Sequence, residues 1–361
     1  MTTFAAMLKG KRILVAPLDW GLGHSARCVP IIQQLIESGA VPVIGADRGP
    51  LALLRAEFPE LEHVRIPGVD VRYSKTSNQL WSMARQFPAM VRSVQAERAL
   101  FDRLRGRLRL DAVISDQRFG LRSPELPSVL ITHQVFPFTP FAQAALRKLN
   151  LRHIARFDRC WVMDEPQAPG LAGELSHGAA LPKNARYIGT LSRMGMHETA
   201  RERYDIAAVI SGPEPQRTLL EHRLMEQLGR IAGNHLLVVG QPDKPRNERS
   251  GSVSIRSHMS GDELAGAMSG ARLIVSRSGY TTLMDLAALG RSALIIPTPG
   301  QQEQEYLGRL HARTGRFLVQ SQESIDLMAA MKSIGKHEAT ARANGNELLA
   351  AALHELAGLM A

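Results

Sequence analysis

Short runs of apolar and β-branched residues alternate with longer amphipathic segments along the whole chain. Between the first two runs, Val29, Ile32 and Leu35 recur at helical spacing until Gly39 ends the helix. Runs separated by helices in this way are typical of parallel α/β sheets. In the first half the runs predict strands over 13–16, 41–46, 63–66, 112–115, 128–132, 160–163 and 186–188.

The same pattern starts again after residue 205. The predicted strands of this second half cover 206–211, 235–239, 253–256, 272–275, 293–296 and 317–319. We therefore expect an α/β protein with two doubly wound, Rossmann-like domains, over 1–195 and 203–337, joined by a polar connection near 191–202. A last helical segment, 338–361, comes after the final strand and is able to pack back on the first domain.

Length and composition support this organisation. The 361 residues suffice for two domains, and a hydrophobic content of 44% is ordinary for a packed protein. No run reaches the roughly 18 apolar residues of a membrane-spanning helix, and the amino terminus lacks a secretory pattern. Cys28 and Cys160 are too few for a disulfide framework or a thiolate metal site. We therefore expect a cytoplasmic protein without a metal.

The net charge of +10 is concentrated in the first half. The stretch 85–109 has seven arginines against Glu97 and Asp102, and 147–159 has five basic residues against Asp158. Such stretches predict an anionic partner. Apolar residues interleave with the arginines of 85–109, so this segment is either an anionic-membrane contact or a solvated helix whose apolar side faces the core.

The loop after the first predicted strand is rich in glycine. Backbone N–H groups of this loop, together with the start of the next helix, can face an anion or a sugar. Gly21, Gly23 and Arg27 are therefore candidate contacts to the acceptor substrate. Gly21-x-Gly23-x-x-Ala26, followed by Asp47, also fits a dinucleotide fingerprint. Several residues separate this motif from the strand, whereas the fingerprint normally follows its strand directly.

His24 lies in this loop, at the carboxyl end of a predicted strand, where open α/β sheets bind their ligands. A histidine there can act as a general base if another group orients its ring. Asp116 ends the strand 112–115 and is the predicted orienting group. His133 ends a neighbouring strand on the same edge and is either a rival base or a contact to the acceptor substrate.

In the second half, the turn between strand 272–275 and the following helix resembles a phosphate site. Its small and hydroxyl residues and its helix start can bind phosphate, and Arg277 can add charge. Asp285, one turn further on, can accept two ribose hydroxyls. The proposed phosphate ligands are Ser278, Gly279, Thr281 and Thr282.

Two more loops of the second half carry polar side chains at strand ends. The stretch 301–305 places Gln301, Gln304 and Glu305 after strand 293–296, a composition that suits sugar hydroxyls better than a core. After strand 206–211, the small residues Ser211 and Gly212 and the cation Arg217 are candidates for a diphosphate.

The stretch 272–307 carries a family resemblance. It reads Ser-Arg-Ser-Gly-Tyr-Thr-Thr-x-x-Asp, then x-Gly-Arg-x-x-Leu-Ile-Ile-Pro, then Gln-Glu-Gln. This pattern resembles the GT-B glycosyltransferases, and within them the MurG-like branch, whose C-terminal domain is of the glycosyltransferase family 28 type. The resemblance implies two Rossmann-like domains facing across a cleft, with a nucleotide-sugar donor in the second domain and the acceptor in the first.

The resemblance also implies roles for single residues. It makes His24 the base and Asp116 its paired acid. In the donor site, the resemblance implies that the diphosphate contacts Gly279, Thr281 and Thr282. It implies that the ribose contacts Asp285 and that the sugar hydroxyls contact Gln304 and Glu305. Asp285 stands where these enzymes commonly have Glu, and the first loop lacks their longer glycine run.

The sequence thus predicts an inverting, metal-independent and cofactor-free glycosyltransferase. It would move an N-acetylhexosamine or a hexose from a UDP-sugar to a hydroxyl acceptor. A polyprenyl-linked acceptor would place the enzyme peripherally on the inner face of the cell membrane. The alternatives are a nucleotide-sugar hydrolase or epimerase of the same fold, an NAD-dependent dehydrogenase, and a non-enzymatic basic protein that binds membrane or nucleic acid. A nucleic-acid partner is not expected, because nucleic-acid binding would not explain why the chain has two Rossmann-like halves.

Overall fold

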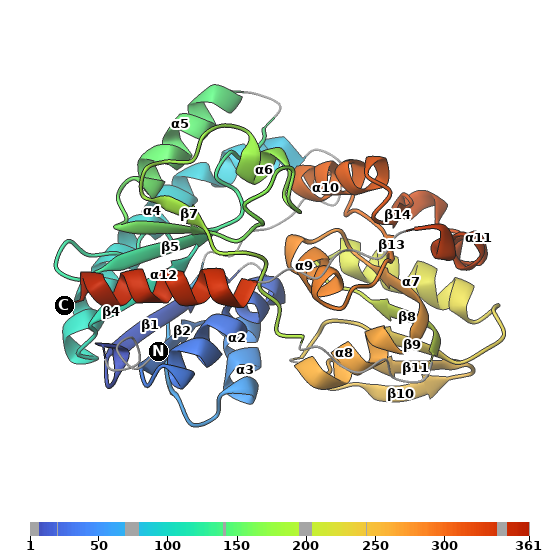
Figure 1. Cartoon of the computed structure of the whole chain (residues 1–361). Helices are drawn as coiled ribbons and strands as arrows, with labels where there is room; N and C mark the ends of the chain where they lie inside the picture. Colours follow the sequence, from blue (N-terminus) through green and yellow to red (C-terminus); the bar gives the residue numbers. More distant parts are fainter. Residues whose placement is uncertain are drawn as a thin grey trace. The chain divides into compact units, whose positions relative to one another are not determined.

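The protein is described from a computed structural model. The structure describes residues 7–19, 21–68, 79–139, 142–194, 204–242, 244–337 and 345–360. For residues 79–91 it describes the backbone only. The chain divides into two compact units, each built on one seven-stranded sheet with helices packed against it (Figure 1). Unit 1 draws its residues from Met1–Val71, Ala84–Leu191 and Ala343–Ala361, and unit 2 from Arg72–Met83 and Ser192–Arg342.

All strand pairs in the sheet of unit 1 are parallel, in the order β3-β2-β1-β4-β5-β6-β7. The strands are β1 (Arg12–Pro17), β2 (Val41–Ala46), β3 (Glu62–Arg65), β4 (Ala112–Asp116), β5 (Ser128–Thr132), β6 (Arg159–Val162) and β7 (Ala185–Tyr187). The chain first builds outward from β1 through β2 and β3, and then adds β4 on the other side of β1. The topological switch point therefore lies between β1 and β4, where Pro17 is in register with Asp116.

Helices cover the sheet of unit 1 with apolar faces. In the helix after β1, Val29, Ile32 and Leu35 are buried as their spacing predicts, and Gly39, with φ of 77°, follows its end. The helices of this unit are α2 (Leu22–Glu37), α3 (Arg48–Glu57), α4 (Gln79–Arg107), α5 (Gln143–Ile154), α6 (Glu174–His177) and α12 (Gly345–Leu359). The division into units counts α4 with unit 1 from Ala84 onward.

The last helix, α12, folds as part of unit 1 and packs against α2. Its buried face carries Leu349, Leu353 and Leu356. At its start, a Cβ on Gly345 would lie 2.2 Å from the carbonyl oxygen of Thr190, so this close backbone approach requires glycine. Near its end, the Glu355 carboxylate accepts hydrogen bonds from two arginines, of β6 and β7, at 2.5 and 2.7 Å.

Unit 2 repeats the doubly wound arrangement in the order β10-β11-β9-β8-β12-β13-β14. Its strands are β8 (Tyr204–Val209), β9 (His235–Val238), β10 (Asn247–Ser250), β11 (Val253–Arg256), β12 (Ala271–Ser276), β13 (Leu294–Ile295) and β14 (Leu318–Val319). The switch point lies between β8 and β12, where Val209 is in register with Ser276. The helices are α7 (Gln216–Leu228), α8 (Gly261–Ser269), α9 (Tyr280–Ala288), α10 (Gln302–Arg313) and α11 (Leu327–Ser333), with short 3₁₀ turns η1 (Gln322–Ser324) and η2 (Ile334–Lys336).

The predicted α/β fold is confirmed. Each strand predicted from an apolar run is present, and its ends lie within two residues of the prediction. The edge strand β10 was not predicted, because all of its residues are exposed and no apolar pattern marks it. The predicted connection 191–202 and the predicted segment 338–361 lie partly outside the described residues.

Candidate functional site

Asp116 stands at the switch point of unit 1 because the chain turns sharply after it. It is the last residue of β4 and is fully buried. The next residue, Gln117, has φ of 58°, in the left-handed region that non-glycine residues rarely adopt, and its side chain donates to Thr132 Oγ1 at 2.8 Å. Backbone strain of this kind is common where a functional side chain must be held in place.

Arg118 holds the loops after β3 and β4 in place at this edge of the sheet. Its side chain is fully buried and pairs with Glu97 of α4, with Nε 3.0 Å from Oε1. It also donates to the carbonyl oxygens of Ile66 and Pro67, at 3.2 and 2.6 Å. Glu97 accepts the N–H of Gly120 in turn. One arginine thus links the ends of β3 and β4 to α4.

His24 meets Asp116 at this edge. The structure places His24 in the first turn of α2, which begins at Leu22, and not in the loop that the sequence suggested. Gly21 precedes that helix with φ of 97° and Gly23 lies within its first turn. His24 Nδ1 lies 2.9 Å from Asp116 Oδ2, and the His24 side chain keeps 18% exposure while that of Asp116 has none. The predicted pair is therefore formed.

Arg27 has a different position from the predicted one. It was expected to contact the acceptor, but it is 2% exposed, with Nε 2.8 Å from Asp116 Oδ2 and Nη2 bonded to Oδ1. Its Nη1 lies 3.0 Å from His133 Nδ1. His133 is itself only 3% exposed, which argues against direct contact with a substrate. Sequence reasoning missed this packing, although the spacing of three residues between His24 and Arg27 puts both on one helix face.

Burial and nearby charges shift the pKa values of both members of the His24–Asp116 pair. Burial raises the pKa of Asp116, but the charges and hydrogen bonds of Arg27 and His24 outweigh this effect and lower that pKa to about 2. Burial, followed by the charge of Arg27, lowers the pKa of His24 below its usual 6.5, against the opposite effect of Asp116. At neutral pH the pair is therefore a carboxylate beside a neutral imidazole, the state that a general base requires.

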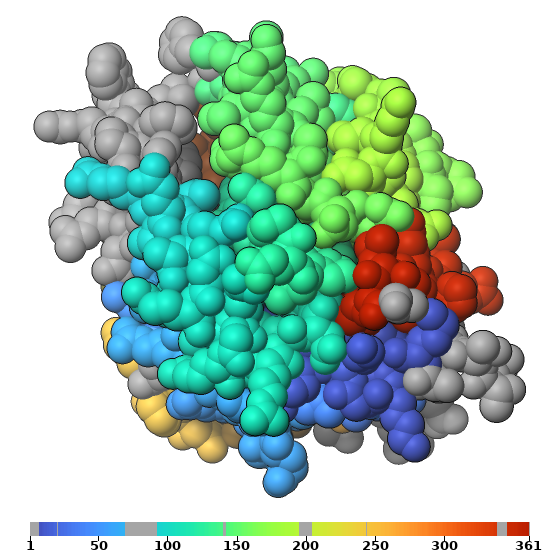
Figure 2. Space-filling view, turned by 90° about the vertical axis from the view of Figure 1, so that its left-hand side faces the viewer, coloured from blue at the N-terminus to red at the C-terminus, as the bar shows by residue number. Residues whose placement is uncertain are grey.

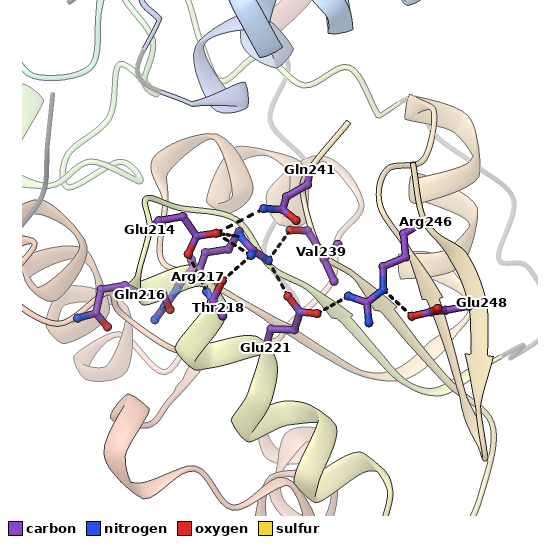
Figure 3. Close-up of polar contacts among 10 residues, drawn as sticks. Glu214, Gln216, Arg217, Thr218, Glu221, Val239, Gln241, Arg246 and Glu248 are labelled. Carbon is purple, nitrogen blue, oxygen red and sulfur yellow. Dashed lines mark hydrogen bonds and ion pairs between the residues drawn. The ribbon is translucent and has the colours of Figure 1, made fainter. Parts of the chain in front are cut away.

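In unit 2, the loop after β8 reaches the switch point with Ser211 and Gly212 exposed. Arg217, expected to reach a diphosphate, is buried in an ion-pair network beneath this loop (Figure 3). Its Nε lies 2.7 Å from Glu214 Oε1, and its Nη1 lies 2.7 Å from Glu221 Oε2. Glu221 Oε1 also accepts a hydrogen bond from Arg246 Nη1 at 2.5 Å, which extends the network. These contacts give Arg217 a structural role.

The turn after β12 forms as predicted, with Gly279 at the start of α9 and with Thr281 and Thr282 in its first turn, partly exposed. Arg277 does not add charge there, because it is 1% exposed and its guanidinium donates to Gln216 O at 2.8 Å and to Gln322 Oε1 at 2.6 Å. Burial lowers the pKa of Arg277 to about 10. Ser278 is buried and donates to the carbonyl oxygen of Gln304 at 2.8 Å.

The polar cluster after β13 begins α10 and organises its own loop. Gln304 Oε1 accepts from the N–H and the hydroxyl of Thr298, at 3.0 and 2.9 Å. Glu305 Oε1 accepts the N–H of Gly300 at 2.8 Å. In contrast, Gln301 Oε1 is buried and has no hydrogen-bond partner among the described residues. Of the contacts described for this cluster, the Gln301 acceptor is therefore the unsatisfied one.

Asp285 lies at the buried side of α9, where the sequence suggested a ribose contact. Its Oδ1 accepts a hydrogen bond from Ser192 Oγ at 2.6 Å, a partner that the sequence gave no reason to expect. Burial raises the pKa of Asp285 to about 6, although Ser192 and Arg193 oppose this effect. The carboxylate is therefore charged at pH 7 and above and largely neutral at pH 5.

Two Rossmann-like units in one chain are the fold of the GT-B glycosyltransferases. Solved structures align over nearly the whole chain, but at low sequence identity. The glycotransferase of kitacinnamycin is 13% identical and covers 98% of this chain and 95% of its own, with a TM-score of 0.61. MurG of Acinetobacter baumannii is 15% identical and covers 96% and 95%, with a TM-score of 0.51.

Residues 221–349 match the model of the glycosyltransferase family 28 C-terminal domain. Curated relatives match over short segments only. The UDP-N-acetylglucosamine--N-acetylmuramyl-(pentapeptide) pyrophosphoryl-undecaprenol N-acetylglucosamine transferase of Syntrophotalea carbinolica is 41% identical over 66 residues, 18% of each chain. The enzyme of the same name from Methylorubrum extorquens is 46% identical over 43 residues, 12% of each chain. The chain thus covers less than a fifth of the length of these relatives.

Proposed function

We propose that this protein is an inverting, metal-independent glycosyltransferase that uses a UDP-sugar as donor and a hydroxyl compound as acceptor. The observation that carries the proposal is the His24–Asp116 pair at the switch point of unit 1, in a chain whose residues 221–349 match the glycosyltransferase family 28 C-terminal domain. The transferred sugar would be an N-acetylhexosamine or a hexose. The curated relatives, named as N-acetylglucosamine transferases acting on an undecaprenol-linked substrate, support a lipid-linked acceptor.

In this mechanism the acceptor hydroxyl loses its proton to Nε2 of His24 and attacks the anomeric carbon. Asp116 orients the imidazole and stabilises its positive charge after proton transfer. The bond from the anomeric carbon to the diphosphate breaks on the opposite side, so configuration inverts. UDP leaves with its negative charge stabilised by preorganised N–H groups at the start of α9 and not by a metal.

The donor site is revised by the contacts of unit 2. Ser211, Gly212, Gly279, Thr281 and Thr282 remain the proposed diphosphate ligands, because they line the two loops at the switch point. Asp285 remains the proposed ribose ligand. Gln301 and Glu305, both partly exposed, remain the proposed contacts to the sugar. Ser278, Gln304, Arg217 and Arg277 support these loops from within.

Binding of UDP tests the donor half of the proposal. A ligand that binds only the folded state stabilises it by about 2.7 kcal/mol at 100 times its dissociation constant. We therefore expect UDP to raise the melting temperature in a thermal-shift assay, and Asp285→Asn to reduce this rise. Because Asp285 must be charged to accept both hydroxyls, the wild-type effect should weaken as the pH falls below about 6.

The controls for this experiment separate the alternatives. The exposed Glu226→Gln variant of α7 should respond to UDP like the wild type. Thymidine diphosphate, which is bound in the structure of the glycosyltransferase SsfS6, tests the choice of base. A response to NADH and none to UDP would make the dehydrogenase the better hypothesis. Release of free sugar from the donor without any acceptor would indicate a hydrolase.

The proposed lipid-linked acceptor directs attention to the basic surface of unit 1. In the described part of α4, Phe101 and Leu104 belong to the core, so they offer no apolar face to a membrane. The side chains of Arg85, Phe87, Met90 and Val91 lie outside the described residues. Figure 2 shows this face, with α4 in cyan and α5 in green. No helix in the described part of the chain is long and apolar enough to cross a membrane.

Basic side chains remain accessible on this face. Arg103 and Arg107 of α4 are exposed. Arg98, Arg122 and Arg156 line one surface pocket of about 340 Å³, whose lining includes a single acidic residue, Asp102. Each cation near an anionic bilayer contributes about 1 kcal/mol of binding at physiological ionic strength. Peripheral attachment to the inner face of the cell membrane is consistent with this surface.

Vesicle flotation tests the attachment. We expect the protein to bind anionic but not neutral liposomes, and salt to weaken the binding by screening. Arg103→Glu with Arg107→Glu should reduce it further, while Glu226→Gln in unit 2 should leave it unchanged. Failure to bind anionic vesicles at low salt would favour a soluble acceptor.

A further inference from the structure

Arg27 lies at the centre of the polar cluster in unit 1. Its guanidinium contacts both oxygens of Asp116, Nδ1 of His24 at 2.8 Å and Nδ1 of His133 at 3.0 Å. The side chains of Arg27 and Asp116 are 2% and 0% exposed. A buried ion pair with this many contacts fixes the direction of every proton around it.

The contact with Arg27 determines the tautomer of His133. Arginine has only N–H donors, so Nδ1 of His133 must be the acceptor of this hydrogen bond. A neutral ring whose Nδ1 carries a lone pair carries its proton on Nε2. His133 therefore has the Nε2–H tautomer, and its Nδ1 lone pair accepts from the guanidinium. Its Nε2 lies 3.4 Å from the amide nitrogen of Gln134, a longer contact than that to Arg27, and in this tautomer both nitrogens are donors, so this contact is not a hydrogen bond.

His24 has the reverse arrangement. Its Nδ1 lies within hydrogen-bond distance of both Asp116 Oδ2 and Arg27 Nη2, so it either donates to the carboxylate or accepts from the guanidinium. Donation forms a charge-assisted hydrogen bond, whereas an unprotonated Nδ1 would direct its lone pair at a carboxylate 2.9 Å away. Arg27 Nη2 has two N–H groups and Asp116 Oδ1 accepts only one of them, so a protonated Nδ1 removes His24 as an acceptor for the other. The charge-assisted bond to the buried carboxylate outweighs the loss of this second bond. The proton therefore belongs on Nδ1, and Nε2 carries the lone pair.

We propose that Arg27 is a positioning residue that neutralises the Asp116 carboxylate, keeps His24 as an uncharged imidazole protonated on Nδ1, and locks His133 into the opposite tautomer. The kinetic consequence rests on the proposed function: His24 is the base and His133 is not. Without Arg27, the charge of Asp116 would act on His24 unopposed and favour the imidazolium, which cannot accept a proton. The titratable and charged groups acting on His24 are Arg27 on its own helix, Asp116 on β4 and His133 after β5.

The experiment is a pH series of two-bond ¹H–¹⁵N spectra on the full chain with ¹⁵N-labelled histidine. His24→Gln and His133→Gln identify the two rings by loss of their signals. In the wild type at neutral pH, we expect protonated Nδ1 and unprotonated Nε2 for His24, and the reverse for His133. Arg27→Met should move the midpoint of the His24 titration to higher pH and release His133 from its single tautomer.

Two further variants separate charge from fold. Arg27→Lys keeps the positive charge, so the His24 midpoint should stay nearer the wild-type value than in Arg27→Met. Arg55→Met removes one exposed cation of α3 in the same unit and should leave that midpoint unchanged. The proposal is wrong if both histidines have the same tautomer in the wild type, or if the midpoint in Arg27→Met stays or falls. The wild-type spectra decide the tautomers even if Arg27→Met does not fold.

These spectra need no substrate, so they separate this proposal from the proposed function. If the two histidines have opposite tautomers but the protein transfers no sugar, the positioning role of Arg27 is supported and the proposed glycosyltransferase function is refuted. If the protein transfers sugar but the two histidines have the same tautomer, the proposed function is supported and the positioning role of Arg27 is refuted.

Discussion

Replacing His24 with alanine should lower the turnover number by about 100-fold to 10,000-fold, the usual contribution of a positioned general base. Affinity for UDP should remain nearly unchanged, because the proposed UDP ligands all belong to unit 2. The remaining pH dependence is also specified. Since the pKa of His24 lies below 6.5, wild-type turnover should stay constant near neutral pH and fall only as His24 becomes protonated at lower pH. Steady-state rates with a UDP-sugar and an acceptor measure both effects.

The controls for His24 lie in the same unit. Asp116→Asn should give a smaller defect in the same direction, because it removes the orienting charge and leaves the base. His354→Ala changes an exposed histidine on α12 and should have wild-type turnover. An equal loss of turnover and of UDP affinity in His24→Ala would assign His24 to structure, and normal turnover in Asp116→Asn would remove Asp116 from the mechanism.

Replacing Arg118 with methionine should lower the free energy of unfolding by about 3–5 kcal/mol, because it leaves the Glu97 carboxylate without its partner in a site where both side chains are buried. The variant also removes donors from the carbonyl oxygens of Ile66 and Pro67. Urea unfolding followed by tryptophan fluorescence measures the loss, since Trp161 is fully buried in the sheet of the same unit.

Two variants show that burial causes this effect. Arg118→Met combined with Glu97→Gln should recover a large part of the loss, because a neutral amide is less costly to bury and can still accept the N–H of Gly120. Arg98→Met removes one of the two arginine partners of the exposed Asp102 and should cost no more than about 1 kcal/mol. A loss of this small size in Arg118→Met would show that water reaches Glu97.

The sheets and the His24–Asp116 pair could be predicted from the sequence for the same reason. Buried parallel strands require unbroken apolar runs, and the residues that end neighbouring strands must meet at one edge. Asp116 follows such a run, and Pro17 of β1 lies beside it in register. The meeting of these strand ends therefore follows from strand order alone.

The partners of the arginines could not be predicted in this way. Arg27, Arg217 and Arg277 were expected to face ligands, and all three are buried against groups of their own unit. A sequence shows that a cation is present but not how deeply it lies. The partners of Arg27 and Arg277 include groups of strands and loops far away along the chain, whereas Arg217 pairs with Glu214 and Glu221 close to it in sequence. The contact between Ser192 and Asp285, separated by 93 positions, has the same cause. Strand β10 was missed because an exposed edge strand needs no apolar residues.

The position of α12 affects how the protein is made on the ribosome. The main segment of unit 2, Ser192–Arg342, lies between the main part of unit 1 and α12 along the chain, so unit 1 lacks its last helix until that segment has been synthesised. At about 5–20 residues per second, the roughly 150 residues from Ser192 to Arg342 take about 8 to 30 s to translate. During this interval the nascent chain exposes the apolar surface that Leu349, Leu353 and Leu356 later cover. Unit 2 can therefore fold before unit 1 is complete, and chaperones have those seconds in which to bind the uncovered face of unit 1.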